Sequence, residues 1–205
     1  MIGLIISIAA LRTAFARPRT TATDDDLVKR AVDGDRAAFD ELYRLHIAST
    51  HRLLTRLVGP IAERDDLIQH VFLEAFRSLH RFRGDAAFTT WLHRIVVNVA
   101  YRHLRRQRRV RWEEVSEDLP GSLASPELTV RRSQELSRAL AYLSALKPKK
   151  RIAYVLRVVE GMSLDEIGAL VGAAAPAVGQ RVKHAQRELD VMVERDRNRI
   201  AREVS

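Results

Sequence analysis

The stretch Ser163–Arg187, SLDEIGALVGAAAPAVGQRVKHAQR, decides the fold of the C-terminal part of this chain. Its apolar residues recur at helical spacing, stop at Gly172 and then resume: Leu164, Ile167, Leu170 and Val171, followed by Val178, Val182 and Ala185. Gly172 can adopt the positive φ that ends a helix, and Pro176 is tolerated in the first turn of the next one. The stretch therefore predicts a helix-turn-helix.

The second of these helices carries polar and basic side chains away from its apolar stripe, namely Gln180, Arg181, Lys183, His184 and Arg187. A helix with such a face suits the major groove of DNA, where amides and guanidinium groups can reach base edges and cations can reach phosphates. The alternative for the same residues is an ordinary helical hairpin inside an α-helical bundle.

The composition is that of a globular protein with a polyanionic partner. Among 205 residues there are 35 Lys and Arg against 26 Asp and Glu, which gives a net charge of +9. The length suits two small domains, and the positive charge favours nucleic acid. The chain has no cysteine, which excludes disulfides and thiolate metal sites and fits a cytoplasmic location.

The first residues form an apolar run, Ile2–Leu11, followed by Ala14-Phe15-Ala16. An export signal would have a similar form, but no positive charge precedes this run, and the run is too short to span a bilayer. We expect residues 1–23 to be a poorly ordered extension that does not insert into a membrane. A short helix that docks elsewhere is the alternative.

Residues 24–111 follow a helical pattern that three breaks divide into four helices, expected at 25–32, 36–58, 63–79 and 88–109. In the third helix, two neighbouring apolar rows predict a wide core face: Leu67, Val71, Ala75 and Leu79, and beside them Ile68, Phe72 and Phe76. Asp24, Asp25 and Asp26 are expected to cap the first helix and to complement its dipole.

Residues 112–126 are rich in acids, Pro, Gly and Ser and carry no helical stripe, so they are predicted to form a linker. A second helical block of four helices follows at 127–194, and 195–205 is a charged C-terminal tail. No alternating β-branched run indicates a strand. The pattern predicts an all-α fold of two small helical domains joined by an acidic flexible linker.

The densest positive charge lies at 101–111, YRHLRRQRRVR, which contains six arginines and no acid. This favours contact with phosphates, and a solvated helix end is the alternative. Upstream, Phe82 and Phe88 bracket a short loop before Trp91, Arg94 and Asn98. Aromatic, guanidinium and amide groups suit unstacked bases, whereas the alternative places Trp91 in the core and Asn98 toward water.

The sequence offers no catalytic constellation. No two of the seven histidines lie four residues apart with an acid between them, as in helical zinc sites, and no G-x-x-x-x-G-K-[ST] loop is present to bind phosphates. We therefore expect no enzymatic activity, no catalytic residue, no metal and no cofactor.

Four segments follow one another along the two blocks: DLIQHVF at 66–72, FRGDAAFTTWLHRIVVN at 82–98, LKPKKR at 146–151 and EGMSLDEI at 160–167. They match, in order, motifs of regions two and four of the extracytoplasmic-function (ECF) sigma factors. The chain resembles such a factor from residue 24 to residue 193. The resemblance implies a sigma factor that binds the β′ coiled coil and the β flap of core RNA polymerase. It would direct the polymerase to promoters through −35 and −10 elements and help to melt the −10 region. An anti-sigma factor is a further candidate partner.

The resemblance also implies three sets of site residues. The core-polymerase set is Asp65, Asp66, Gln69 and His70. The −10 set, which would hold a base flipped out of the stack, is Phe82, Arg83, Gly84, Asp85, Phe88, Thr90, Trp91, Arg94, Asn98, Arg102, Arg105 and Arg106. The −35 set is Ala175, Pro176, Ala177, Gln180, Arg181, Lys183, His184 and Arg187.

Three departures from the family pattern stand out. His70 replaces a usual acid, Gly168 replaces a usual alanine, and 177–181, AVGQR, replaces the common T-V-x-S-R. The last change predicts an uncommon −35 preference and a recognition helix softened by Gly179. Two other functions stay open: a sigma-like mimic that titrates an anti-sigma factor, and a stand-alone helix-turn-helix regulator.

Overall fold

The computed structural model describes residues 22–59, 61–113 and 138–203, and every regular element within them is a helix. The expected all-α class is thereby confirmed. The chain divides into two compact units, the first drawn mainly from Arg17–Arg105 and the second from Arg106–Gly168 and Ala173–Ser205. Most of the expected N-terminal extension and the linker from residue 114 onward lie outside the described residues.

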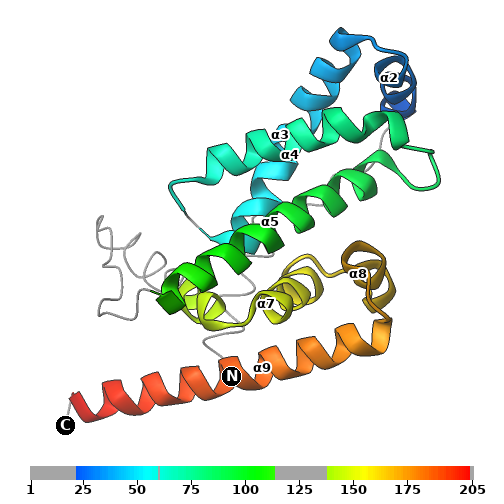
Figure 1. Cartoon of the computed structure of the whole chain (residues 1–205). Helices are drawn as coiled ribbons and strands as arrows, with labels where there is room; N and C mark the ends of the chain where they lie inside the picture. Colours follow the sequence, from blue (N-terminus) through cyan, green and yellow to red (C-terminus); the bar gives the residue numbers. More distant parts are fainter. Residues whose placement is uncertain (1–21, 60, 114–137, 204–205) are drawn as a thin grey trace. The chain divides into compact units, whose positions relative to one another are not determined.

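The first unit is a set of helices around one apolar core. In chain order these are α2 (Ala22–Val32), α3 (Arg36–Val58), α4 (Arg64–Ser78), the 3-10 turn η1 (Leu79–Arg81) and α5 (Phe88–Glu113) (Figure 1). α2 packs against α3, and α3 packs against α4. The largest fully buried aliphatic side chains are Leu42, Leu54, Leu57, Leu92, Val71, Val96 and Val97. Four helices were predicted for this block, and α3 has the predicted bounds.

Local residues fix both ends of α3. The Asp35 carboxylate accepts hydrogen bonds from the backbone N–H groups of Ala37 and Ala38, at 2.9 and 3.2 Å, and so caps the helix. Gly59 ends it at a φ of 86°. Arg30 donates to Asp35 at 2.6 Å, and this hydrogen bond, followed by the one from Ala38, lowers the pKa of the Asp35 carboxyl.

Asp24 does not cap the first helix, contrary to the expectation. Because α2 begins at Ala22, Asp24 already lies in the first helical turn. Its Oδ2 is 3.3 Å from Nε2 of His46 on α3, and both residues are buried. Asp25, also in the first turn, is exposed and complements the helix dipole. A tertiary partner, which periodicity does not reveal, therefore decides the role of Asp24.

The core face expected for α4 is correct except at Leu67, which is half-buried, and at Phe76. Ile68, Val71, Phe72 and Ala75 are buried, but Phe76 is 50% exposed. The Phe76 ring lies edge-on to Phe39 of α3, with the centroids 5.0 Å apart. A partner on a single helix covers only one side of a ring, so half of Phe76 stays at the surface.

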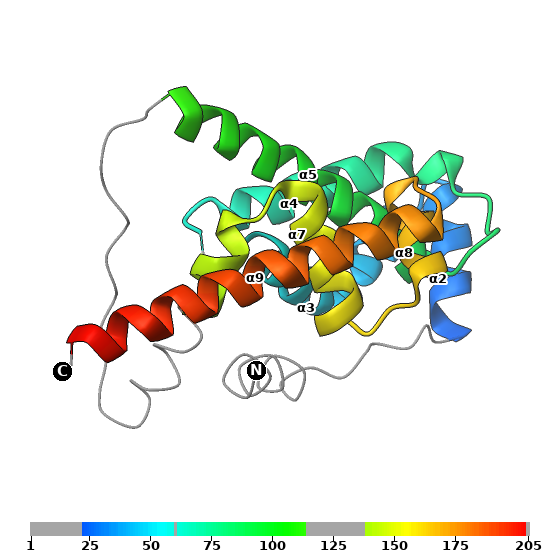
Figure 2. The same cartoon turned by 90° about the horizontal axis from the view of Figure 1, so that it is seen from below.

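The second unit contains residues 138–145 in helical conformation, α7 (Pro148–Tyr154), a π-helical turn η2 (Val155–Val159), α8 (Leu164–Val171) and α9 (Ala175–Glu203). α7 packs against α9. Tyr154, Leu156, Ile167 and Leu189 are fully buried and centre the core. Figure 2 shows α9 as one unbroken helix, which continues through the residues assigned by sequence to a charged tail.

The predicted helix-turn-helix is present. α8 starts with a reciprocal pair in which the Ser163 N–H donates to Glu166 Oε2 at 2.7 Å and the Glu166 N–H donates to Ser163 Oγ at 3.2 Å. Gly172 ends α8 at a φ of 63°, as its position in the sequence predicts. None of the described helices has an 18-residue stretch apolar enough to cross a membrane.

Candidate functional site

The four candidate core-polymerase residues share one exposed surface of α4. Asp65, Asp66, Gln69 and His70 are all exposed. Residues three and four apart are neighbours on a helix, so Asp66, Gln69 and His70 form a continuous patch. The nearest described partner of Asp65 is Arg64, at 3.6 Å. The structure therefore leaves this patch open to a binding partner.

Two apolar residues that the sequence motifs did not identify as site residues extend the same face. Leu73 is 51% exposed and follows Gln69 and His70 by one turn, and Phe76, 50% exposed, follows Leu73. Beside them on α3, Tyr43 is 39% exposed, and its ring lies 4.6 Å from that of Phe72. The signal in the sequence that could have identified them is their helical spacing from Gln69. We call Asp66, Gln69, His70, Leu73 and Phe76 the α4 face.

An ionic bridge joins the α4 face to α5. Glu74 Oε1 lies 3.1 Å from Nε2 of His70, and the same oxygen accepts a hydrogen bond from Nη2 of Arg102. Glu74 lies below the exposed face, with 29% of its side chain accessible, while about half of each partner side chain is exposed. One carboxylate oxygen thus contacts both a candidate core-polymerase residue and a candidate −10 residue.

Three aromatic rings meet at the start of α5. Phe82 lies 6.0 Å from Phe88 and 5.5 Å from Trp91, and Phe88 lies 5.5 Å from Trp91. Phe88 is 2% exposed and also contacts His46, whereas Phe82 and Trp91 are half-buried. Phe88 therefore anchors the group, and Phe82 and Trp91 are the rings that border the surface.

The polar members of the −10 set surround this aromatic group. Arg83, Gly84 and Asp85 are exposed in the loop before α5, and Gly84 has a φ of 76°. The other polar members lie exposed along α5, and their spacing of mostly four residues keeps them near one face: Thr90, Arg94, Asn98, Arg102, Arg105 and Arg106. A basic row beside two accessible rings can contact phosphates and stack on bases.

The candidate −35 residues lie on the first part of α9, opposite its buried side. Val178, Ala185 and Leu189 face the core of the second unit. The exposed members of the set are Pro176, Ala177, Gln180, Lys183, His184 and Arg187, and Ala175 and Arg181 are half-buried. The structure thus brings the whole set onto one helix with a single polar side.

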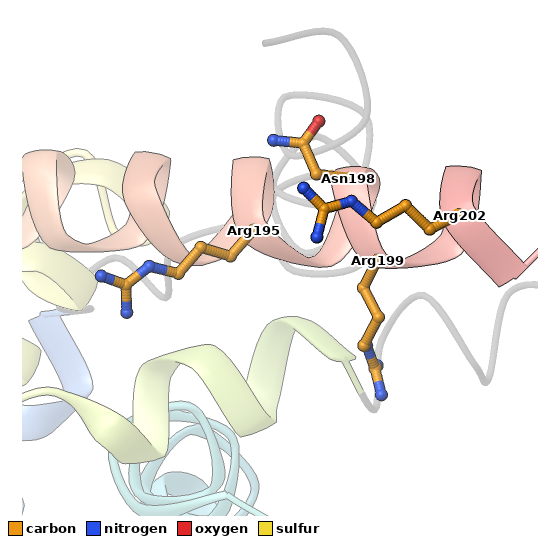
Figure 3. Close-up of a pocket in the computed structure, with 4 residues that line it drawn as sticks. All are labelled: Arg195, Asn198, Arg199 and Arg202. Atoms are coloured by element: carbon orange, nitrogen blue, oxygen red, sulfur yellow. The ribbon is translucent and has the colours of Figure 1, made fainter.

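Beyond this face, α9 carries a further polar group of three arginines and one asparagine. Arg195, Asn198, Arg199 and Arg202 line an open pocket (Figure 3). Figure 3 shows Asn198 and Arg202 on one side of the helix and Arg199 on the other. Asp196, between them, accepts a hydrogen bond from Tyr142 at 2.6 Å and lies 3.6 Å from Arg199. The hydrogen bond from Tyr142 holds the C-terminal part of α9 against residues 138–145.

The architecture and two family matches define the class of protein. Residues 42–110 match the family model for sigma-70 region 2, and residues 136–189 match the one for sigma-70 region 4. The fold and its helix-turn-helix are those of a sigma-70 family protein. Within the part of the chain that the structure describes, no group of three His, Cys, Asp or Glu is placed to hold a metal ion.

Named relatives show which members of the sigma-70 family this chain is similar to. The ECF RNA polymerase sigma factor SigE of Mycolicibacterium smegmatis is 36% identical over 162 residues, which cover 76% of this chain and 63% of that relative. The ECF RNA polymerase sigma-E factor of Escherichia coli K12 is 33% identical over 182 residues, covering 84% of this chain and 95% of that one. The solved structure of CnrH in complex with the cytosolic domain of CnrY is 28% identical, with a TM-score of 0.61, and covers 85% of this chain and 99% of that one. This chain belongs to the ECF sigma factors.

Proposed function

We propose that this sigma factor binds core RNA polymerase through the α4 face and brings it to promoters. In this proposal the loop before α5 and α5 itself contact the −10 element and help to open it, and α9 contacts the −35 element. The protein supplies recognition and strand separation, while the polymerase supplies the chemistry.

The observation that carries the proposal is the separation of two unlike surfaces on the first unit. The α4 face combines one acid, an amide and an imidazole with the half-exposed Leu73 and Phe76. Protein interfaces commonly have this composition, with apolar side chains at the centre and polar ones around them. The α5 row is basic and lies next to Phe82 and Trp91, as a nucleic-acid surface requires. A stand-alone DNA-binding module has no use for the first surface.

Strand opening needs a site that stabilises an unstacked base. Removing a base from the stack costs a few kcal/mol. Phe82 and Trp91 can offset part of this cost, because stacking of a base on an aromatic ring contributes about 1–3 kcal/mol. Arginines of α5 then hold the strand by its phosphates. Asn98 has the donor and acceptor groups to read a base edge.

Run-off transcription with core polymerase tests the proposal. The template is the promoter found by mapping transcript starts after overexpression of the protein. We expect transcripts only when the protein, core polymerase and that promoter are combined. A sigma-like mimic would bind an anti-sigma factor and yet fail this assay.

Core binding is tested separately by substitution on the α4 face. Gln69→Ala should weaken binding of the full chain to core polymerase, measured by competition for core with a labelled sigma factor. Arg44→Ala is the matched control, because Arg44 is exposed on α3 and lies outside the face. If Gln69→Ala and Arg44→Ala bind core equally, the α4 face is not the docking surface, and a stand-alone regulator becomes the better interpretation.

An anti-sigma factor is a further proposed partner. CnrH, the 28% identical relative, was solved with the cytosolic domain of CnrY. The apolar part of the α4 face would suit a protein that competes with core polymerase. In that case Phe76→Ser should weaken both complexes.

A further inference from the structure

We propose that Glu74 is an internal competitor of DNA phosphate for Arg102, and that His70 sets how strongly it competes. The inference rests on the proposed function, because it takes Arg102 to be a contact to the −10 strand. Neither Glu74 nor this use of His70 follows from the sequence motifs. The structure alone brings the three side chains together.

The geometry defines a three-membered bridge between two helices. Arg102 on α5 donates through Nη2 to Glu74 Oε1 on α4. His70, one turn before Glu74, places Nε2 3.1 Å from the same oxygen. Arg102 and His70 therefore contact the same carboxylate oxygen.

Sharing has an electrostatic consequence for Arg102. A guanidinium that donates to a carboxylate must lose part of this interaction before it can bind a phosphate. Both side chains are partly exposed, with 56% of Arg102 and 29% of Glu74 accessible. Solvent screens such a pair, so its effect on DNA affinity should be about twofold to fivefold. Glu74 thus lowers the affinity of the free protein for DNA without blocking it.

His70 changes the strength of this competition. As a second polar partner of the same oxygen, it satisfies part of the Glu74 charge and loosens the hold on Arg102. With an acid at position 70, Glu74 would face a like charge one turn away and would depend on Arg102 alone. The other charged residues within one turn on α4 are Asp66, before His70, and Arg77, after Glu74, and both are exposed. Histidine at position 70 therefore favours release of Arg102 to DNA.

The test measures DNA binding by the full chain without polymerase. The probe is a fluorescein-labelled single-stranded 20-mer of random sequence, because phosphate contacts do not depend on sequence. Fluorescence anisotropy across a KCl series gives the affinity and its salt slope. The variants are Arg102→Ala, Glu74→Gln and His70→Glu, and the double variant that combines the last two. Arg77→Gln is the control, because it changes the charge of α4 by the same amount as His70→Glu.

We expect Arg102→Ala to weaken binding and to reduce the salt slope by about 0.7, the value for one phosphate contact on a single strand. Glu74→Gln should tighten binding about twofold to fivefold and steepen the slope. His70→Glu should weaken binding more than Arg77→Gln does. In the Glu74→Gln background, its effect should fall to that of Arg77→Gln.

The outcomes separate the inference from the proposed function. If Arg102→Ala binds the probe as the unmodified protein does, Arg102 is no DNA contact, and both the proposed −10 surface and this inference lose that residue. If Arg102→Ala weakens binding but Glu74→Gln does not tighten it, only the inference is overturned. An effect of His70→Glu that persists undiminished in the Glu74→Gln background would likewise contradict it.

Discussion

Tyr154 is a buried residue whose hydroxyl the fold does not use. Its side chain is 1% exposed, and its oxygen has no hydrogen-bond partner among the described residues. Burial, with a smaller contribution from the negative charge of Asp190, raises its pKa to about 12. Tyr142 differs, because its hydroxyl donates to Asp196 at 2.6 Å. The two tyrosines of the second unit therefore form a natural pair for comparison.

Tyr154→Phe should stabilise the second unit by about 1 kcal/mol, because it removes an unsatisfied buried hydroxyl and keeps the ring. Tyr142→Phe, the matched change, should destabilise it by about 1 kcal/mol through loss of the hydrogen bond to Asp196. Urea unfolding monitored by circular dichroism measures both. Equal effects of the two substitutions would show that hydroxyl satisfaction does not distinguish these sites.

The raised pKa of Tyr154 also predicts an alkaline effect. Because the folded state favours the neutral phenol, ionisation of Tyr154 has no effect on stability below the ordinary pKa of 10, and stability is lost as pH rises from 10 toward about 12. Over this window the unmodified protein should lose more stability than Tyr154→Phe. Unfolding curves at pH 9, 10 and 11 give the free energy of unfolding of both proteins. If both lose the same amount of stability, the ionised Tyr154 side chain is in contact with water.

At the scale of the element, local signals explain which helix bounds could be predicted. Asp35 and Gly59 mark the ends of α3 in the sequence itself, and the bounds of α3 were predicted correctly. α8 and the turn at Gly172 were predicted for the same reason. The C-terminal end of α9 was not predicted correctly, because no glycine or proline in residues 190–203 marks where the helix stops. The π-helical turn η2 has no local signal, since it inserts an i→i+5 bond from the Glu160 N–H to the Val155 carbonyl.

The candidate site could be predicted where motifs alone identify residues. The Gln69 and His70 positions belong to such a motif, and the structure leaves both exposed. Phe76 was missed because an apolar row predicts a core without showing where the covering helix ends. Leu73 was missed because it lies in neither apolar row and in none of the motifs. Glu74 was missed because its meaning depends on Arg102, which lies 28 residues further along the chain. The functional assignments themselves stay predictions.

The two unusual glycines of the helix-turn-helix should respond in opposite ways to alanine. A Cβ on Gly179 would lie 3.4 Å from the flexible end of Leu164, so Gly179→Ala should stabilise α9 by about 1 kcal/mol. A Cβ on Gly168 would lie 2.5 Å from the carbonyl oxygen of Ala173. Gly168→Ala should therefore destabilise the turn despite its better helix propensity. Thermal unfolding measures both, and stabilisation by Gly168→Ala would contradict this close approach.

At the scale of the whole molecule, the two DNA surfaces should be separable by probe. Replacing Arg105 and Arg106 together with alanine should reduce the salt slope for single-stranded DNA by roughly 1.4, two contacts at about 0.7 each. Binding to a duplex that carries only the −35 element should not change. Arg187→Ala should weaken binding to the −35 duplex and leave binding to single-stranded DNA unchanged. Fluorescence anisotropy with the two probes checks this, and equal losses on both probes would show that the surfaces act as one.

The half-exposed Leu73 and Phe76 have a practical consequence for anyone who handles the isolated protein. Concentrated salts that are excluded from protein surfaces strengthen apolar association, so they should favour self-association through this patch. Dilute salt instead strengthens the hold of the arginines on contaminating nucleic acid. Purification therefore has a window of ionic strength limited from both sides. Co-expression with a protein that covers the patch should widen this window at its upper end.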